Sequence, residues 1–221
     1  MNKAIDRRKA GHFLLDYAHL LALSAVVLVL LIWGTFHFVT RATREEKLRF
    51  FLGAYDVSEI GLERELRMQF GESGLREVEF HVYSPASNKY STYFYSTAAN
   101  CDFIVLKEKD LLLLKEDVGF YFRSMNENLI SALCPSDFDF DFYVYEENIF
   151  GIKIHDYLNS EYDRRLDFSS WLAFSNPENE EYDDHFYLLI GEKSPNFASD
   201  SDLGAQAGRY LIERFYREEN A

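Results

Sequence analysis

The sequence contains only two cysteines, Cys101 and Cys134, among its 221 residues. They lie far apart and do not form the Cys-x-x-Cys spacing of many zinc and redox sites. Because cysteine usually behaves as a small hydrophobic residue, we expect two free, buried thiols. A disulfide between them is the alternative if the domain lies in an oxidising compartment, since one sequence does not decide the pairing.

Basic residues are scarce after residue 40. Residues 41–221 hold 19 of the 23 lysines and arginines but 35 of the 37 aspartates and glutamates, a balance of −16, whereas residues 1–40 carry +2. A surface this negative repels phosphate groups, and neutralising phosphates supplies most of the affinity of proteins for nucleic acids. We therefore expect no nucleic-acid partner.

The sequence also lacks the short motifs of common enzyme classes. It has no G-x-S-x-G elbow, S-x-x-K, G-x-G-x-x-G or P-loop, and its six histidines form no H-E-x-x-H or zinc-type spacing. His155-Asp156 and Asp183-Asp184-His185 each place a base beside a carboxylate, but such neighbours are common in an acidic chain. We expect a non-catalytic protein, with a membrane-tethered hydrolase as the minor alternative.

Residues 137–142 read DFDFDF, in which three aspartates alternate with three phenylalanines. Three carboxylates in a D-x-D-x-D pattern resemble the start of a calcium loop. Such a loop needs Gly at its sixth position and Glu at its twelfth, where this chain has Phe142 and Asn148. Alternation also puts the carboxylates on one face of a strand and the rings on the other. We expect a half-buried strand, no metal site and no cofactor.

Residues 17–39 form one long apolar run, YAHLLALSAVVLVLLIWGTFHFV, without a formally charged side chain. A helix of this length, at about 1.5 Å per residue, spans the roughly 30 Å hydrocarbon layer of a bilayer. The alternative is a cleaved signal peptide, whose apolar region has about 7–15 residues and ends in small residues. We expect an uncleaved transmembrane helix at 17–39 in contact with membrane lipid, a short basic tail at 1–16 and a connector at 40–47.

The charges that flank this helix do not fix its orientation. Cytoplasmic loops of membrane proteins carry an excess of lysine and arginine. Four basic residues lie on each side of the apolar run: Lys3, Arg7, Arg8 and Lys9 before it, and Arg41, Arg44, Lys47 and Arg49 after it. The count is a tie.

The remaining residues, 48–221, predict one α/β domain. Strand signatures occur at 48–54, 78–82, 102–106, 138–145, 150–154 and 186–190. Helical spacing occurs at 57–70, with Asp56 or Ser58 as N-cap, and at 87–99 and 203–216. The order strand, helix, strand, helix, strand with buried central runs predicts a three-layer domain with a mostly parallel sheet. Residues 159–184 give no readable pattern.

The first half of this domain resembles one lobe of a type II extracellular solute-binding protein of an ABC importer. LRFFLGA at 48–54 is similar to the first strand of that family, which ends in a small residue and leads to a helix. VEFHVY at 78–83 and KYSTYFYSTAA at 89–99 resemble the second strand and the helix that follows it. Cys101-Asp102-Phe-Ile-Val resembles the third strand, which opens with an aspartate.

The second half carries the resemblance further, with one departure. FGIKI at 150–154 resembles the stretch before the family's chain crosses into a second lobe, and FYLLIGEKSPN at 186–196 resembles the returning strand and its turn. The resemblance covers 48–155 and 185–216. Between them the family has a whole second lobe, so this chain is expected to be membrane-anchored and to lack that lobe.

The resemblance implies a bacterial, extracytoplasmic domain, which gives the orientation that the charges leave open: a single-pass protein of the cell membrane with a cytoplasmic N-terminus. It also implies binding or scaffolding rather than catalysis. The expected partners are another envelope or membrane protein and a small solute. Ligands of parallel sheets bind at the C-terminal edge of the strands. The candidate residues at that edge are Tyr55, Asp56, Tyr83, Asn88, Tyr90 and Lys107.

The N-terminal residues favour a second interpretation. RRKAGHFLLD, residues 7–16, resembles a type IV prepilin leader, in which a glycine precedes the cleavage point, an acidic residue lies five positions beyond it and a long apolar helix follows. Here Gly11 is the glycine and Asp16 replaces the usual glutamate. A pilin-like or envelope-assembly subunit is therefore the alternative function.

Overall fold

The computed structural model describes residues 7–58, 61–135, 139–175, 184–197 and 202–216. The chain divides into two compact units, residues 1–42 and residues 43–221. Residues 1–6 of the expected basic tail lie outside the described residues, and residues 7–16 already belong to the first helix.

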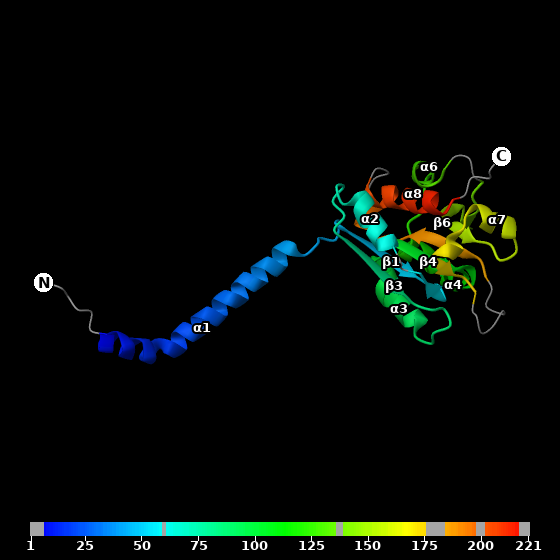
Figure 1. The fold of residues 1–221 in the computed structure, drawn as a ribbon. Coiled ribbons are helices and arrows are strands. Elements are labelled where there is room, and N and C mark those ends of the chain that lie inside the picture. The colour runs from blue at the N-terminus through cyan, green and yellow to red at the C-terminus, as the bar shows by residue number, and fades with distance from the viewer. Residues whose placement is uncertain (1–6, 59–60, 136–138, 176–183, 198–201, 217–221) are drawn as a thin grey trace. The chain divides into compact units, whose positions relative to one another are not determined.

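The first unit consists of one long helix, α1 (Arg7–Thr40) (Figure 1). Within it, Tyr17–His37 has a mean hydropathy of 2.2, and its apolar side chains, such as Leu30 and Trp33, are exposed. The length and composition of this segment fit a membrane-spanning helix, and an N-terminal secretion signal has the same features.

The second unit is built on a six-stranded sheet among the described residues, in the order β3-β1-β4-β8-β6-β5. The strands are β3 (Glu77–Val82), β1 (Lys47–Leu52), β4 (Phe103–Lys107), β8 (Phe186–Ile190), β6 (Asn148–His155) and β5 (Phe142–Tyr145). Strands β3, β1 and β4 are parallel, whereas the pairs β4–β8, β8–β6 and β6–β5 are antiparallel.

The sheet is thus mixed, and the prediction of a mostly parallel sheet is correct only for its first three strands. A tight turn joins β5 to β6, with Glu146 and Glu147 both at positive φ (48° and 66°). A two-residue turn of this kind forms a hairpin, so the two strands that it connects, β5 and β6, must be antiparallel.

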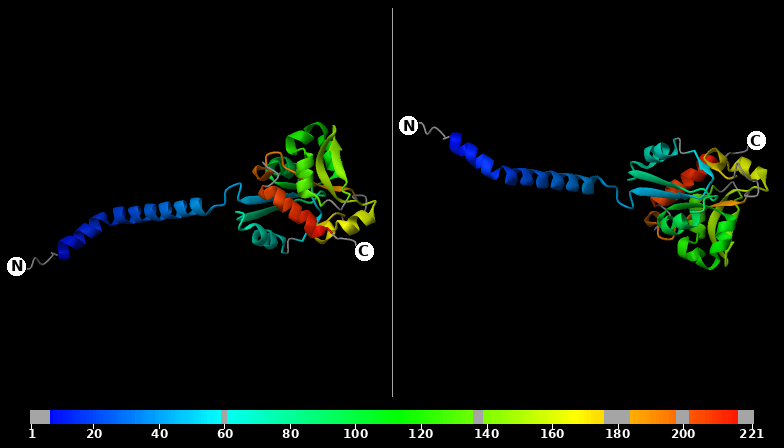
Figure 2. Two further views of the ribbon diagram at one scale, coloured as in Figure 1. Left: turned by 90° about the horizontal axis from the view of Figure 1, so that it is seen from above. Right: turned by 90° about the horizontal axis from the view of Figure 1, so that it is seen from below.

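Helices cover both faces of the sheet (Figure 1), and the two faces are seen in turn in Figure 2. One face packs against α2 (Leu62–Phe70), α6 (Glu127–Leu133) and α8 (Leu203–Phe215). The other packs against α3 (Tyr90–Thr97), α4 (Glu108–Leu114) and the short α5 (Val118–Tyr121). Alternate residues of one strand enter the two cores: Phe50 faces the first and Phe51 the second. Both cores lie within the second unit.

The segment that follows β1 forms a strand where the sequence predicted the start of a helix. Asp56–Val57 form β2, which pairs antiparallel with β7 (Leu172–Ala173). Helix α2 begins only at Leu62, behind Gly61, so neither Asp56 nor Ser58 caps it. Ile60, which was assigned to the same helix, lies outside the described residues.

The stretch between β6 and β8 folds back onto the same domain. It contains α7 (Ser160–Arg165), the 3-10 turn η3 (Phe168–Ser170) and β7. Trp171 is buried there and its ring lies 6.1 Å from that of Phe50 and 5.7 Å from that of Phe215. The described part of residues 155–184 therefore closes over the first core instead of forming a separate lobe.

The other predicted elements are largely confirmed. The helices predicted at 87–99 and 203–216 correspond to α3 with the 3-10 turn η1 (Ala98–Asn100) and to α8. The strand predicted at 138–145 begins only at Phe142; Asp137 and Phe138 lie outside the described residues. Two short 3-10 turns complete the described elements: η2 (Lys115–Asp117) and η5 (Pro195–Phe197).

Candidate functional site

The C-terminal edge of the parallel strands carries the side chains that could contact a ligand. Strand β1 leads into Gly53 and Tyr55, β3 into Tyr83, and β4 ends at Lys107. Helix α3 places Tyr90 at the same edge, where its hydroxyl lies against the backbone of Gly53. This is the edge at which the sequence predicts Tyr55, Tyr83, Tyr90 and Lys107.

Tyr90 is the most deeply placed of these residues, with 7% of its surface exposed. Its ring lies 6.0 Å from that of Phe51 in the second core. Burial, and next the neighbouring Asp110 carboxylate, raise the pKa of Tyr90 well above its usual value. Asp110 lies close enough to Tyr90 for each group to shift the pKa of the other, but the Tyr90 hydroxyl has no hydrogen-bond partner of good geometry among the described residues.

Asp110, in the first turn of α4, is the charged member of the site that sequence reasoning missed. Burial raises its pKa to about 6, Asp184 adds to the rise, and Lys107 and Tyr90 oppose it. Lys107 Nζ lies 3.9 Å from Asp110 Oδ1, which is too far for a hydrogen bond. The second carboxylate oxygen, Oδ2, is buried and without a hydrogen-bond partner in the described part of the chain.

A small cavity of about 50 Å³ opens between α3 and α4 beside these two side chains. Its walls include Tyr90, Phe94, Tyr95, Leu106, Asp110 and Leu113. Tyr95 and Leu113 stand at its rim, where they are 56% and 84% exposed. The cavity therefore combines an apolar wall with one carboxyl group and one phenol at its base.

The other predicted residues do not line this cavity. Tyr83 stacks on Tyr93 with ring centroids 4.2 Å apart and packs against Phe51 of the second core at 5.4 Å. Asp56 is exposed in β2, where its side chain accepts a hydrogen bond from the backbone N–H of Val57. Asn88 is exposed in the turn before α3. Tyr55 lies near enough to Tyr90 to contribute to the rise in its pKa.

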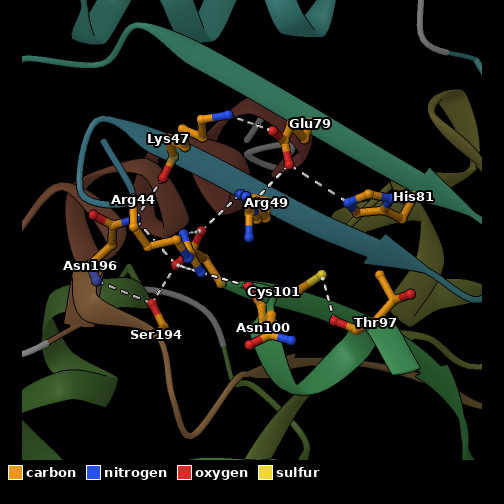
Figure 3. Close-up of polar contacts among 11 residues, drawn as sticks. Arg44, Lys47, Arg49, Glu79, His81, Thr97, Asn100, Cys101, Ser194 and Asn196 are labelled. Carbon is orange, nitrogen blue, oxygen red and sulfur yellow. Dashed lines mark hydrogen bonds and ion pairs between the residues drawn. The ribbon is translucent and has the colours of Figure 1, made fainter. Parts of the chain in front are cut away.

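A second polar cluster lies at the opposite, N-terminal edge of β1 and β4 (Figure 3). At its centre the fully buried carboxylate of Asp102 accepts hydrogen bonds from the Arg44 guanidinium, the Arg49 backbone N–H and the side chains of Ser194 and Asn196. Every one of these donors comes from the domain itself. A buried charge paired this completely is explained by its structural role.

The same edge carries an ion-pair network between β1 and β3. Lys47 Nζ lies 2.6 Å from Glu77 and 2.8 Å from Glu79, and Glu79 also pairs with Arg49 at 2.8 Å (Figure 3). Cys101 donates from its thiol to the Thr97 carbonyl at 3.5 Å. These ion pairs join neighbouring strands.

The histidines next to carboxylates in the sequence find other partners in space. His155 Nδ1 lies 2.6 Å from Asp163, and His185 Nδ1 lies 3.2 Å from Asp156. Asp184 instead accepts a hydrogen bond from the backbone N–H of Lys109 at the start of α4. Asp183 lies outside the described residues.

Among the described residues, no group of three or more His, Cys, Asp or Glu side chains is close enough to hold a metal ion. Within those residues Asp139 and Asp141 are exposed and Phe140 is buried, as an alternating pattern requires. Asp141 forms an ion pair with Lys153 at 3.0 Å.

Comparison with known proteins gives no independent assignment, because no protein-family model, curated protein or solved structure matches this chain.

Proposed function

We propose that this chain is a membrane-anchored, extracytoplasmic binding domain of a bacterial cell, without catalytic function, that resembles a single lobe of a type II solute-binding protein. The observation that carries the proposal is the cavity beside Tyr90 and Asp110 at the C-terminal edge of the parallel strands. This is the edge at which open α/β sheets hold their ligands. The unpaired polar atoms at its base supply groups that a ligand can satisfy.

The arrangement of β8 supports the resemblance. The resemblance implies that the strand at 186–190 returns to the sheet of the first lobe. Here β8 runs antiparallel between β4 and β6, after the segment that would otherwise lead to the second lobe. With that segment folded onto the domain through β7, hinge closure around a large solute is not available. The ligand is therefore a small molecule, or a group on a larger partner.

A ligand-dependent rise in melting temperature tests binding, because a molecule that binds only the folded state stabilises it. The full-length protein in mild detergent would be melted in the presence of sugars, amino acids, short peptides, small amines and divalent cations. At a ligand concentration of about 100 Kd the stabilisation is about 2.7 kcal/mol, or roughly 5–10 °C for a domain of this size. No shift with any ligand class, on protein that melts cooperatively, would contradict a solute-binding role.

The anchor is supported by the length of the apolar helix. Helix α1 has 34 residues and its apolar segment Tyr17–His37 has 21. Both exceed the roughly 7–15 apolar residues of a signal peptide. Intact mass measurement on protein from the membrane fraction, after an alkaline carbonate wash, separates the alternatives. An anchor stays in the pellet with its N-terminus uncut, whereas a signal peptide is removed and the domain is released.

The same measurement tests the pilin-like alternative, since processing after Gly11 would leave a membrane-bound chain that begins at His12. The orientation requires a second experiment. Protease added to intact spheroplasts should digest residues 43–221 and leave a cytoplasmic marker protein untouched. If the domain is digested only after lysis, the extracytoplasmic location is wrong.

A further inference from the structure

The polar atoms beside the cavity between α3 and α4 indicate which kind of ligand it would bind. Two of its polar atoms, the Tyr90 hydroxyl and Asp110 Oδ2, are buried and lack hydrogen-bond partners among the described residues. Leaving a polar group buried and unpaired costs about 1–3 kcal/mol, and more for a charged group. An ionised carboxylate oxygen only accepts hydrogen bonds, so a ligand that pairs with Asp110 must be a donor.

From this geometry, and resting on the proposed binding function, we infer that the cavity takes the head group of a small primary amine in its protonated form. An alkylammonium group offers three N–H donors and a positive charge, which suits one carboxylate and one phenol oxygen. Phe94 and Tyr95 add aromatic rings to the wall, and aromatic faces attract cations.

The size of the cavity limits what enters it. A volume of about 50 Å³ is far below the roughly 300–1,000 Å³ of a pocket that encloses a drug-sized ligand. It therefore holds a head group, while the rest of the ligand remains outside. The exposed side chains of Leu113 and Tyr95 at the rim give an apolar body a surface to lie on.

The two acceptor atoms are covered in this structure, so binding of the head group requires the Asp110 side chain to turn toward the cavity. That side chain is 20% exposed, whereas Tyr90 is only 7% exposed. Lys107, 3.9 Å from Asp110 Oδ1, is the nearest competing cation. The strong negative balance of the domain favours a cationic ligand over an anionic one.

Isothermal titration of the full-length protein in detergent, at pH 7.5, tests the inference with three matched probes: n-butylamine, n-butanol and tetramethylammonium. The amine should bind at least about tenfold more tightly than either of the others, because the alcohol lacks charge and the quaternary ion lacks N–H donors. Equal affinity for all three, or no heat with the amine, would overturn the assignment.

Variants locate the site. Asp110→Asn removes the charge and Tyr90→Phe removes the hydroxyl; each should weaken amine binding about tenfold or more. Asp117→Asn changes an exposed carboxylate in η2 and should leave the affinity unchanged. Amine binding that survives in both Asp110→Asn and Tyr90→Phe would place the site elsewhere and refute the inference.

The ligand panel described above separates the two proposals. If sugars, amino acids or peptides stabilise the protein and amines do not, the amine assignment is wrong while the binding function stands. If no ligand class stabilises the protein and the titration with amine shows no heat of binding, both the binding function and the amine assignment are wrong.

Discussion

Arg44 and Asp102 form a bidentate ion pair, with Nη1 3.0 Å from Oδ2 and Nη2 3.1 Å from Oδ1. Arg44 lies in the segment that enters the second unit, and Asp102 directly precedes β4. The Arg44 side chain is 29% exposed while that of Asp102 is fully buried. The same guanidinium donates to the Asn100 carbonyl at 2.6 Å. The entry of the chain into the domain is thereby fixed to the centre of the sheet.

Replacing Asp102 with alanine should destabilise the domain severely. The substitution leaves the Arg49 N–H, Ser194 and Asn196 without their acceptor, and removing one partner of a buried ion pair costs about 3–5 kcal/mol. Urea unfolding of residues 43–221, followed by the fluorescence of the buried Trp171, measures the loss. Asp117→Ala, at an exposed position, is the control and should fall within about 0.5 kcal/mol of the parent. A loss below about 1 kcal/mol in D102A would show that the cluster is dispensable.

Gly53 should not tolerate a methyl group. A Cβ at this position would lie 2.7 Å from the carbonyl oxygen of Val105 and even closer to the Tyr90 hydroxyl. Overpacking of this kind costs about 1–3 kcal/mol, and it would also move Tyr90 at the base of the cavity. Gly119→Ala is the matched control, because nothing lies within 4 Å of its Cβ. Urea unfolding should show a clear loss for G53A and none for G119A; equal stability of the two variants would argue against close packing at Gly53.

Both cysteines should be inert in the folded protein. Cys101 and Cys134 are free and buried, as the sequence predicted. Burial raises the pKa of each thiol to about 12, so almost none is present as the reactive thiolate near pH 8. A chromogenic disulfide reagent should therefore label neither thiol in the native protein and both after denaturation. Rapid labelling of either cysteine before denaturant is added would contradict this packing.

The central strands could be predicted because a buried strand has an apolar sequence that is recognisable without knowing its neighbours. Strands β4 and β8 are covered on both faces and read as almost continuous apolar runs, and β1 contains the apolar segment Phe50–Leu52. Strand direction could not be predicted in the same way. The antiparallel placement of β8 between β4 and β6 depends on which strands it meets, and short apolar runs of either direction look alike.

Pairings between distant residues explain the clearest error. Asp56 is a good helix N-cap by type, but its backbone pairs with Ala173, more than a hundred residues later. The residues around Asp56 contain no pattern that predicts the pairing of β2 with β7, and β7 has only two residues.

The candidate site was half predicted for a similar reason. Tyr90 and Lys107 were selected because they follow strands whose C-terminal ends share an edge. Asp110 was not, because it lies in a leucine-rich helix where a charged residue usually faces solvent. Only the fold shows that this carboxylate is enclosed between α3 and α4.

Asp110→Asn should make the domain more stable at neutral pH and leave it unchanged in acid. Burial raises the folded-state pKa of Asp110 from 3.8 to about 6, so the folded protein binds this proton more tightly than the unfolded chain does. The stability that the protonated group contributes is fully present below pH 3.8 and is lost as the pH rises through 6.

The charged and titratable neighbours of Asp110 are Lys107, Tyr90 and Asp184, and the pKa of about 6 already includes their effects. Asparagine mimics the protonated acid at every pH, so the advantage of D110N should grow from near zero at pH 4 to at most about 3 kcal/mol at pH 8. Urea unfolding of both proteins across this range measures the difference, with D117N as the exposed control. An advantage that does not change with pH would mean that the Asp110 carboxylate is hydrated in the folded state, and would remove the desolvated anion on which the amine site depends.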